Sequence, residues 1–273
     1  MIRIYHPNAK INIGLSVTEK RSDGFHNVET IYYPVSLCDT LTIETANDSS
    51  SEKLSFTCNG SSRELLVNNL CCKAFYLLDA DYNLPSTRIS LHKQIPVGAG
   101  LGGGSSDAAH TLIALNDLYE LQISIEKLTD YARQLGSDCA FFLHRKPVLG
   151  LGRGDIIKPV RLSLARFHIV IIDPQIFVST AEAFSLIKPQ IKDISLSQLI
   201  KAPVYEWRNT IFNDFEKAIF KKFPKIEQIK SLLYENGAVY ASMTGSGSNV
   251  YGIFDKKPTI DSNLNYITLQ DGI

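Results

Sequence analysis

The sequence predicts an α+β protein that is built of two lobes. Strand-like and helix-like patterns alternate irregularly along the chain, without the strict order of a βαβ protein. A length of 273 residues accommodates one large domain or two modest ones. A compositional pause, "GLGRGDIIKPV" at residues 150–160, separates two regions that each contain strands and helices. We therefore place the boundary near residue 155, with lobes at 1–155 and 156–273.

The first lobe contains four segments with strand character. The segment "KINIGLSV" at 10–17 alternates apolar and polar residues, which is typical of a half-buried strand. The other three are rich in β-branched and aromatic residues, and the last of them ends at Pro96: 28–37, 39–45 and 87–97. The polar stretch "ANDSSSEK" at 46–53 resembles a turn.

Three helices are predicted in the first lobe. Apolar residues recur at helical spacing within 68–83. The segment 105–121 begins with Ser and Asp side chains that can cap a helix, and the segment 124–136 ends at a glycine. The second lobe has a buried strand at 166–174, a helical region at 213–237 that is broken near Pro224, and two strands. These strands lie at 238–243 and 248–254, on either side of the tight turn "TGSGS".

Composition argues against several classes of function. The 28 basic and 28 acidic residues balance, which disfavours a protein that binds nucleic acid through a broad basic face. The five cysteines are odd in number and form no C-x-x-C pair, and the six histidines lack metal-ligand spacing. No stretch has the length of a membrane span or the pattern of a signal peptide. We expect a cytoplasmic protein with neither nucleic-acid nor membrane partners.

Five glycines occupy the seven positions from Gly98 to Gly104, directly before a predicted helix. A structural turn needs only one or two glycines, so the cluster indicates a backbone that a ligand approaches closely. No lysine follows the glycines, which excludes the Walker loop, and the G-x-G-x-x-G match lacks the second strand of a dinucleotide-binding unit. An anion-binding loop at a helix start remains, where Ser105 and Ser106 offer hydroxyl groups to a phosphate or to Mg²⁺.

Polar residues at two further places in the sequence are candidates for a functional role. Lys10 and Asn12 lie two residues apart and share one face of the first predicted strand, opposite Ala9 and Ile11. They form either a solvated edge or a polar stripe that faces a cleft. Asp138 precedes a strongly apolar run, a position at which an aspartate is often a turn or cap residue.

Three ordered blocks of this sequence resemble the GHMP kinase superfamily, which phosphorylates small metabolites with ATP. The block "PVGAGLGGGSSDAA" resembles its central motif, and "SMTGSGSNVYGIF" resembles its C-terminal motif. The block around "KRSDGFH" resembles one subfamily, whose substrate is the CDP-linked polyol 4-diphosphocytidyl-2-C-methyl-D-erythritol of the non-mevalonate isoprenoid pathway.

The resemblance implies a two-lobed fold with a mixed sheet in the N-terminal lobe, an antiparallel sheet in the C-terminal lobe, and the active site in the cleft between them. It also implies direct in-line transfer of a phosphoryl group from ATP to the 2-hydroxyl of the substrate. The segment "GSDCAFF" matches the family segment whose aspartate is the catalytic base, which makes Asp138 the base and Lys10 the charge stabiliser. Cys139 and Ala140 depart from the family pattern.

The resemblance assigns binding residues by position. For ATP it implies Asn69, Lys93, Pro96, Gly98, Gly100, Leu101, Gly102, Gly103, Gly104, Ser105 and Ser106. For the substrate it implies Asn12, Phe25, His26, Tyr32, Thr180, Phe184, Gly245, Ser246 and Gly247. Mg²⁺ is expected to bind through ATP, with Ser105 as a candidate ligand and no dedicated protein site.

Some alternatives stay open at this point. Asp107 replaces the commoner Asn of the glycine motif and lies either near the triphosphate or against the start of its own helix. The chain is expected to be a monomer or a weak homodimer. The rival functions are a kinase for another small alcohol, such as mevalonate or homoserine, and a protein that binds nucleotide or RNA without catalysis.

Overall fold

The computed structural model describes residues 1–46, 52–59, 69–260 and 266–270. They form two compact units, neither of which is continuous in sequence. Unit 1 comprises Met1–Ala9, Leu37–Ile95 and Gly102–Arg145, and unit 2 comprises Lys10–Ser36, Pro96–Leu101 and Lys146–Ile273. The division expected near residue 155 therefore falls inside unit 2, and the first predicted strand, 10–17, belongs wholly to this unit, which also holds the C-terminal half.

Unit 1 contains a mixed four-stranded sheet in the order β1-β4-β6-β5. Its strands are β1 (Ile2–Tyr5), β4 (Thr40–Thr45), β5 (Leu54–Asn59) and β6 (Thr87–His92). The β5–β6 pair is parallel, whereas β4 pairs antiparallel with both β1 and β6. The strands β1 and β5 were not predicted; β1 is an edge strand of 4 residues, and its apolar residues Ile2 and Ile4 are exposed. The turn predicted at 46–53 lies partly outside the described residues.

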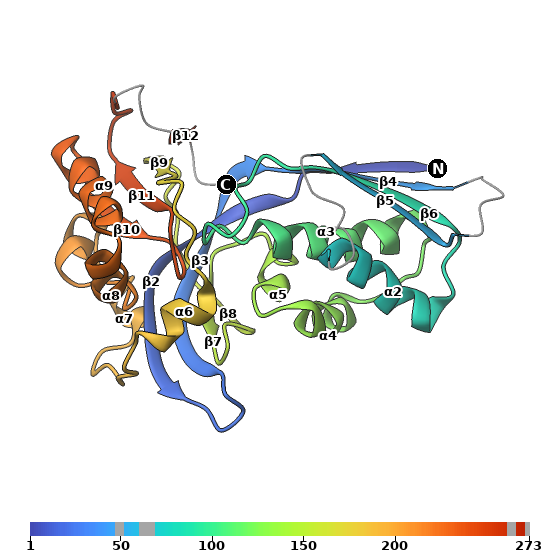
Figure 1. The fold of residues 1–273 in the computed structure, drawn as a ribbon, viewed down its shortest axis with the longest axis horizontal. Helices are drawn as coiled ribbons and strands as arrows, with labels where there is room; N and C mark the ends of the chain where they lie inside the picture. Colours follow the sequence, from blue (N-terminus) through green and yellow to red (C-terminus); the bar gives the residue numbers. More distant parts are fainter. Residues whose placement is uncertain (47–51, 60–68, 261–265, 271–273) are drawn as a thin grey trace. The chain divides into compact units, whose positions relative to one another are not determined.

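The helices of unit 1 cover one face of this sheet (Figure 1). They are α2 (Leu70–Tyr82), α3 (Gly103–Leu118), α4 (Ile125–Leu135) and the single turn α5 (Cys139–Phe142). The first three agree with the predicted helices, apart from residue 68, which lies outside the described residues. The Asn69 side chain caps α2 and the Ser124 side chain caps α4. Residues on every side of α3 are buried, which makes it the central helix of the unit.

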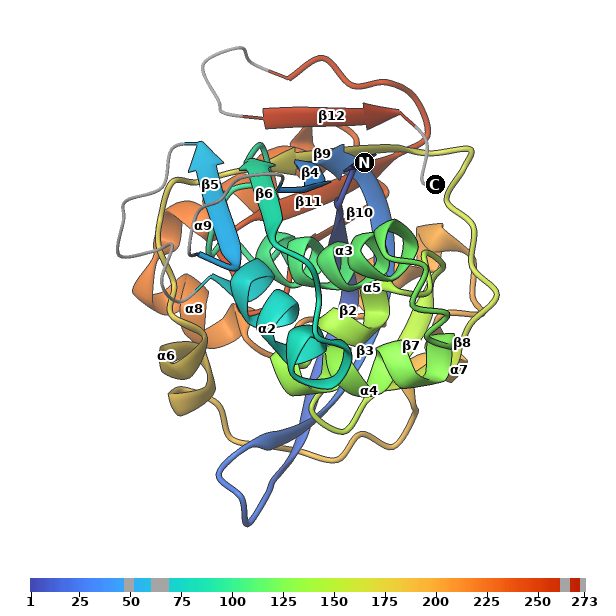
Figure 2. The same cartoon turned by 90° about the vertical axis from the view of Figure 1, so that its right-hand side faces the viewer.

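Unit 2 contains two sheets. One has the order β2-β3-β7-β8, with β2 (Asn8–Lys20), β3 (His26–Cys38), β7 (Val148–Leu151) and β8 (Ile156–Pro159). The other is antiparallel in the order β10-β11-β9-β12 (Figure 2), with β9 (His168–Ile172), β10 (Tyr240–Met243), β11 (Val250–Phe254) and β12 (Tyr266–Gln270). The interpretation of 150–160 as a pause between lobes was wrong. Gly152 and Gly154, both with positive φ, form the turn of the β7–β8 hairpin there.

The helices of unit 2 are mostly short. They are α6 (Thr180–Ser185), α7 (Leu196–Leu199), the 3-10 helix η1 (Val204–Asn209), α8 (Glu216–Lys222) and α9 (Pro224–Glu235). The predicted break near Pro224 is confirmed, because this proline occupies the first turn of α9, where its missing N–H has no partner to lose. Apolar residues of α8 and α9 form one core with residues of β2, β9 and β11.

The strand β2 is more deeply buried than predicted. Instead of alternating between core and solvent, every residue from Asn8 to Leu15 is buried. The polar members of this run, Lys10 and Asn12, are 3% and 2% exposed. The prediction of a half-buried strand was therefore wrong: the polar face is covered by other parts of unit 2, which supply hydrogen-bond partners for it.

Candidate active site

The glycine-rich segment begins in unit 2 as a loop, residues 96–101, whose backbone is packed against a turn. Gly98 and Gly100 have positive φ values of 70° and 78°, which L side chains rarely adopt. A Cβ atom at Gly100 would lie 2.1 Å from the carbonyl oxygen of Thr244. Glycine is therefore required at position 100 both by the backbone conformation and by the close approach of the Thr244–Gly247 turn.

The segment continues in unit 1 as the start of α3. Gly102, with φ of 72°, is the N-cap residue and has no side chain with which to cap the helix. The first-turn N–H groups and the helix dipole therefore present a positive end that suits an anion. Ser105 is partly exposed on this turn. Ser106, by contrast, is fully buried, and its hydroxyl group lies 3.4 Å from Nδ1 of His110.

An ion cluster lies beneath the start of α3. Lys93 Nζ forms ion pairs with Asp39 and, at 2.6 Å, with Asp107, and both carboxylates are buried. Gly103 makes room for it, since a Cβ atom there would lie 3.1 Å from Lys93 Nζ. The pKa of Asp107 is raised to about 7, mainly because burial removes its carboxyl group from water; Lys93 opposes this rise and the Asp39 carboxylate contributes to it. Of the two locations considered for Asp107, the structure therefore favours the helix start, where the carboxylate pairs with Lys93.

Asp39 was not predicted as a functional residue. Its carboxylate accepts hydrogen bonds from the backbone N–H groups of Gln94 and Ile95, as well as from Lys93. It thereby anchors the chain immediately before the glycine-rich loop. The only signal in the sequence is an aspartate between two strand patterns, which a surface turn explains equally well.

Lys10 and Asn12 form a hydrogen-bonded network within unit 2. Lys10 Nζ donates to Asn12 Oδ1 at 2.5 Å and to the carbonyl oxygen of Gly100 at 2.9 Å. Asn12 Nδ2 donates to Thr30 Oγ1 at 2.9 Å, and the Asn12 backbone N–H donates to Thr244 Oγ1 at 3.1 Å. The network ties β2 to the glycine loop and to the Thr244–Gly247 turn. It also sets the ammonium group of Lys10 against the loop backbone.

Asp138 lies at the start of α5 in unit 1, as its N-cap residue. The preceding Gly136 packs beside Cys139 and Ser105, since a Cβ atom at Gly136 would lie 3.3 Å from Cys139 Sγ and 3.9 Å from Ser105 Oγ. This places the turn that carries Asp138 next to the first turn of α3. Burial raises the pKa of the Cys139 thiol to about 12, so this cysteine is an inert packing residue.

Aromatic side chains gather at the start of β3 and on α6. Phe25 is 52% exposed, and the guanidinium group of Arg153 lies 5.0 Å from its ring centre. The rings of His26 and Phe184 stack with their centres 4.8 Å apart. Tyr32, in contrast, is buried, and its ring lies over Gly150, where a Cβ atom would approach it to 2.4 Å. Arg153 was not predicted as a site residue, because it lies in the segment interpreted as a pause.

The remaining predicted site residues have other surroundings. Asn69 Oδ1 accepts a hydrogen bond from the Cys71 N–H and so caps α2. Thr180 Oγ1 lies 3.2 Å from Ser246 Oγ, which connects α6 to the Thr244–Gly247 turn. Leu101 is buried and accepts a hydrogen bond from the Lys10 backbone N–H through its carbonyl oxygen.

Two kinds of feature are absent from the described residues. Across residues 1–46, 52–59, 69–260 and 266–270, no group of three or more His, Cys, Asp or Glu side chains is placed to hold a metal ion. Over the same described ranges, no helix has the length and apolar character needed to cross a membrane.

Comparisons with known proteins agree on one family. The profile of the GHMP kinases N terminal domain matches residues 69–146, and that of the GHMP kinases C terminal domain matches residues 191–267. A 4-diphosphocytidyl-2-C-methyl-D-erythritol kinase of Bacteroides fragilis is 50% identical over 260 residues, with 94% of each chain covered. The enzyme of the same name from Bacteroides thetaiotaomicron is 48% identical over 260 residues, with the same coverage.

The fold of this chain is also similar to that of a solved structure. The crystal structure of a 4-(cytidine 5'-diphospho)-2C-methyl-D-erythritol kinase superimposes with a TM-score of 0.78 at 32% sequence identity. The superposition covers 92% of this chain and 90% of that one. The similarity therefore extends over nearly the whole chain and is not confined to the glycine-rich motif.

Proposed function

This chain belongs to the GHMP kinases and, among them, to the 4-diphosphocytidyl-2-C-methyl-D-erythritol kinases, and on that premise we propose which of its residues carry the reaction. The protein is an ATP-dependent kinase that phosphorylates the 2-hydroxyl group of this CDP-linked polyol, a step of the non-mevalonate isoprenoid pathway. The transfer is direct and in line, without a phosphorylated enzyme intermediate.

The observation that carries the proposal is the glycine-rich start of α3. Glycines with positive φ lead into a helix whose N-cap residue has no side chain, so the backbone N–H groups of the first turn are available to phosphate oxygens. We assign the ATP phosphates to residues 98–105. Ser106 is buried against His110, so its contribution is to hold the helix start rather than to offer a hydroxyl group.

Phosphoryl transfer requires positioning and charge neutralisation more than covalent chemistry. Asp138 is assigned as the base that accepts the proton of the 2-hydroxyl group as it attacks the γ-phosphorus. Lys10 is assigned to the negative charge that develops on the transferring group. The contacts of Lys10 with Asn12 and Gly100 support this role, because they hold the ammonium group on the loop that is assigned to ATP.

The aromatic cluster is assigned to the cytosine base. Phe25 presents an exposed face, and an aromatic ring stacks on a base without needing a hydrogen bond. His26 offers polar ring atoms, and Phe184 stacks beside it. Tyr32 is packed over Gly150 and shapes the wall of the site from beneath. Thr180 and the Gly245–Gly247 backbone are assigned to the diphosphate and polyol.

Mg²⁺ is expected with ATP, and the residues present fit this mode of binding. Mg²⁺ keeps several waters and binds through substrate phosphates with one or two protein oxygens. Ser105 carries a partly exposed hydroxyl group on the first turn of α3, and its oxygen atom is the protein ligand assigned to the ion. When bound, Mg²⁺ neutralises phosphate charge.

Three further assignments concern the protein in the cell. All five cysteines lie among the described residues and none of them forms a disulfide there, which fits a reducing compartment, so we place the enzyme in the cytoplasm. The balanced charge of 28 basic and 28 acidic residues supports the absence of a nucleic-acid partner. We propose that the active form is a monomer or a weak homodimer.

The test is a substrate panel with the purified protein, ATP and Mg²⁺. ADP formation is followed with 4-diphosphocytidyl-2-C-methyl-D-erythritol, mevalonate and homoserine, and the product is examined by phosphorus NMR. We expect turnover only with the CDP-linked polyol, and a new phosphomonoester on its tertiary carbon. Turnover confined to another alcohol would establish the rival kinase function, and binding of ATP without any turnover would establish a silent nucleotide-binding protein.

A further inference from the structure

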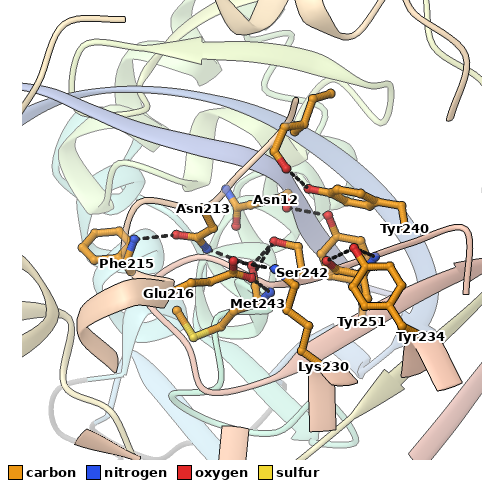
Figure 3. Close-up of polar contacts among 12 residues, drawn as sticks. Asn12, Asn213, Phe215, Glu216, Lys230, Tyr234, Tyr240, Ser242, Met243 and Tyr251 are labelled. Carbon is orange, nitrogen blue, oxygen red and sulfur yellow. Dashed lines mark hydrogen bonds and ion pairs between the residues drawn. The ribbon is translucent and has the colours of Figure 1, made fainter. Parts of the chain in front are cut away.

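A short connection that runs from η1 into the first residue of α8, residues 211–216, contacts two parts of the candidate site in unit 2. On one side it pairs with β2, since the Leu15 N–H donates to the Phe212 carbonyl at 3.0 Å and the Asp214 N–H donates to the Leu15 carbonyl at 2.8 Å. On the other side it reaches the end of β10 through Asn213 and Glu216 (Figure 3). The connection therefore links the strand that carries Lys10 to the Thr244–Gly247 turn.

The amide group of Asn213 binds the backbone of this turn. Asn213 is 3% exposed, and its Nδ2 donates to the carbonyl oxygens of Met243 and Gly245, both at 2.8 Å. Its Oδ1 accepts from the Phe215 N–H at 3.0 Å, which fixes the orientation of the amide group. The polar atoms of this side chain are thus fully used on the backbone.

Glu216 anchors the strand just before the turn. Its Oε1 accepts from the Met243 N–H at 2.8 Å and from Ser242 Oγ at 3.1 Å, and its Oε2 pairs with Lys230 at 2.6 Å (Figure 3). Asn213 and Glu216 together bind both backbone polar groups of Met243 and, within the turn, the carbonyl group of Gly245. The entry to the turn is therefore held by side chains that come from outside the β10–β11 hairpin.

The contact with the Gly245 carbonyl has a consequence for the next residue. In a planar trans peptide group, the C=O of one residue and the N–H of the following residue point in opposite directions. A hydrogen bond that holds the Gly245 carbonyl toward Asn213 therefore directs the Ser246 N–H away from Asn213. The same rule applies two residues earlier, where Asn213 holds the Met243 carbonyl and the Thr244 N–H donates to the Asn249 carbonyl at 2.9 Å.

We propose that Asn213 is a positioning residue for the CDP-linked substrate, because it orients the Gly245–Ser246 peptide group so that the Ser246 N–H serves as a donor to the substrate diphosphate. This inference rests on the proposed function for the identity of the ligand, but the orientation of the peptide group is a property of the free protein. The turn itself contacts Asn12 and Gly100 through Thr244. A reoriented turn would disturb substrate binding next to the residues assigned to the reaction.

Two variants of Asn213 and one matched control test the proposal. N213D has nearly the same shape and keeps the acceptor for the Phe215 N–H, but its carboxylate cannot donate to the Gly245 carbonyl; N213A removes the whole amide group. The control is N116A, because Asn116 also bridges a loop through its amide group, with Nδ2 donating to the Ile123 carbonyl and Oδ1 accepting from the Ile123 N–H. Asn116 belongs to unit 1 and lies near the other end of α3.

The readouts are steady-state kinetics, thermal unfolding and exchange of the Gly247 amide proton, which the structure bonds to the Thr244 carbonyl at 3.0 Å. We expect N213D and N213A to raise KM for the CDP-linked substrate at least about tenfold while KM for ATP changes by less than about twofold. Protection of the Gly247 amide should fall in both variants and remain unchanged in N116A. A general loss of stability would not separate the two KM values.

Each outcome is decisive. Equal changes in both KM values for N213D, or wild-type protection of the Gly247 amide in both Asn213 variants, would overturn the proposal. If N213A does not fold, the two KM values and the Gly247 amide exchange of N213D test the proposal alone. If the wild-type protein does not act on the CDP-linked polyol, the proposed function fails, and amide exchange at Gly247 still decides whether Asn213 orients the turn.

Discussion

Lys10 is a charged side chain that is only 3% exposed, in a strand whose other residues are mainly apolar. Burial of an ammonium group costs several kcal/mol unless hydrogen bonds replace its water shell. Asn12 and the Gly100 carbonyl supply such bonds, and the Tyr32 ring centre lies 5.5 Å away. A charge held in this way is preorganised, so it needs little reorganisation to meet a phosphoryl group.

Removal of the proposed base provides the most direct test at the residue scale. In D138N the side chain keeps its shape but no longer accepts a proton, so we expect kcat to fall by about 10²–10⁴-fold. Binding of ATP, measured by calorimetry, should stay close to that of the wild type. The matched control is D130N, which changes an exposed aspartate on α4. Unchanged turnover in D138N would remove this residue from the mechanism.

The buried carboxyl group of Asp107 should make stability depend on pH. Its pKa is raised from 3.8 to about 7 in the folded protein. Between these values the folded state binds more protons than the unfolded chain, so the free energy of unfolding falls as the pH rises through this window. The D107N variant lacks this titration. Relative to wild type, it should therefore gain about 2 kcal/mol between pH 5 and pH 8.

Urea denaturation of both proteins at the two pH values measures this difference, and D130N again serves as the control. A stability difference between D107N and wild type that is equal at pH 5 and pH 8 would contradict the raised pKa. The expected sign is opposite to that of an ordinary salt-bridged aspartate, which stabilises the fold as the pH rises.

At the scale of elements, the positions of the glycine-rich segment differ in whether they tolerate a side chain. Gly100 is strained for any side chain, by its φ of 78° and by the Thr244 carbonyl oxygen 2.1 Å from a Cβ atom. Gly104 lies in the first turn of α3, and a Cβ atom there meets nothing within 4 Å. The sequence motif alone does not separate these two roles.

The matched pair G100A and G104A tests this distinction. G100A should destabilise the protein by about 1–3 kcal/mol, because a non-glycine residue must adopt a strained conformation or displace the Thr244–Gly247 turn. G104A should be neutral or stabilise by up to about 1 kcal/mol, because alanine favours the helix. Denaturant unfolding at one pH gives both values. Equal stabilities of the two variants would show that the loop relaxes around an added methyl group.

At the scale of the whole molecule, the chain is divided into units that interleave in sequence. Leu15, Val17 and Val28 of β2 and β3 belong to the same core as residues of β9, α8 and α9. The C-terminal half of the chain therefore depends on a hairpin that is formed near the N-terminus. A two-domain protein cut at a linker would lose no such core residues.

A fragment of residues 156–273 should therefore not fold alone. It lacks β2, β3 and β7, so the core of unit 2 loses Leu15, Val17 and Val28, and β8 loses the strand with which it pairs. By circular dichroism we expect no cooperative thermal transition for this fragment and a cooperative transition for the full chain. A sharp transition of the isolated fragment would show that the C-terminal half is an independent domain.

The sequence allowed the family motifs and the longer helices and strands to be predicted, whereas several short elements were missed. Strands with runs of β-branched residues and helices with apolar periodicity were located within a few residues. The missed elements are short: β1, β7, β8, α5 and α7 have 4 residues each. Contacts with other segments therefore decide whether they form. The same limit applies to Asn213 and Asp39, whose roles depend on the backbone groups they meet.

The order of residues by itself determined the family, the glycine-rich loop before a helix, and the residue types that phosphoryl transfer requires. Only the tertiary structure decided that Lys10 is buried, that Asp107 pairs with Lys93, and that the first hairpin belongs to the C-terminal unit. The physical reason is that local propensity and motif spacing act within a few residues. Burial, ion pairing and close backbone contact depend on which distant segments come together when the chain folds.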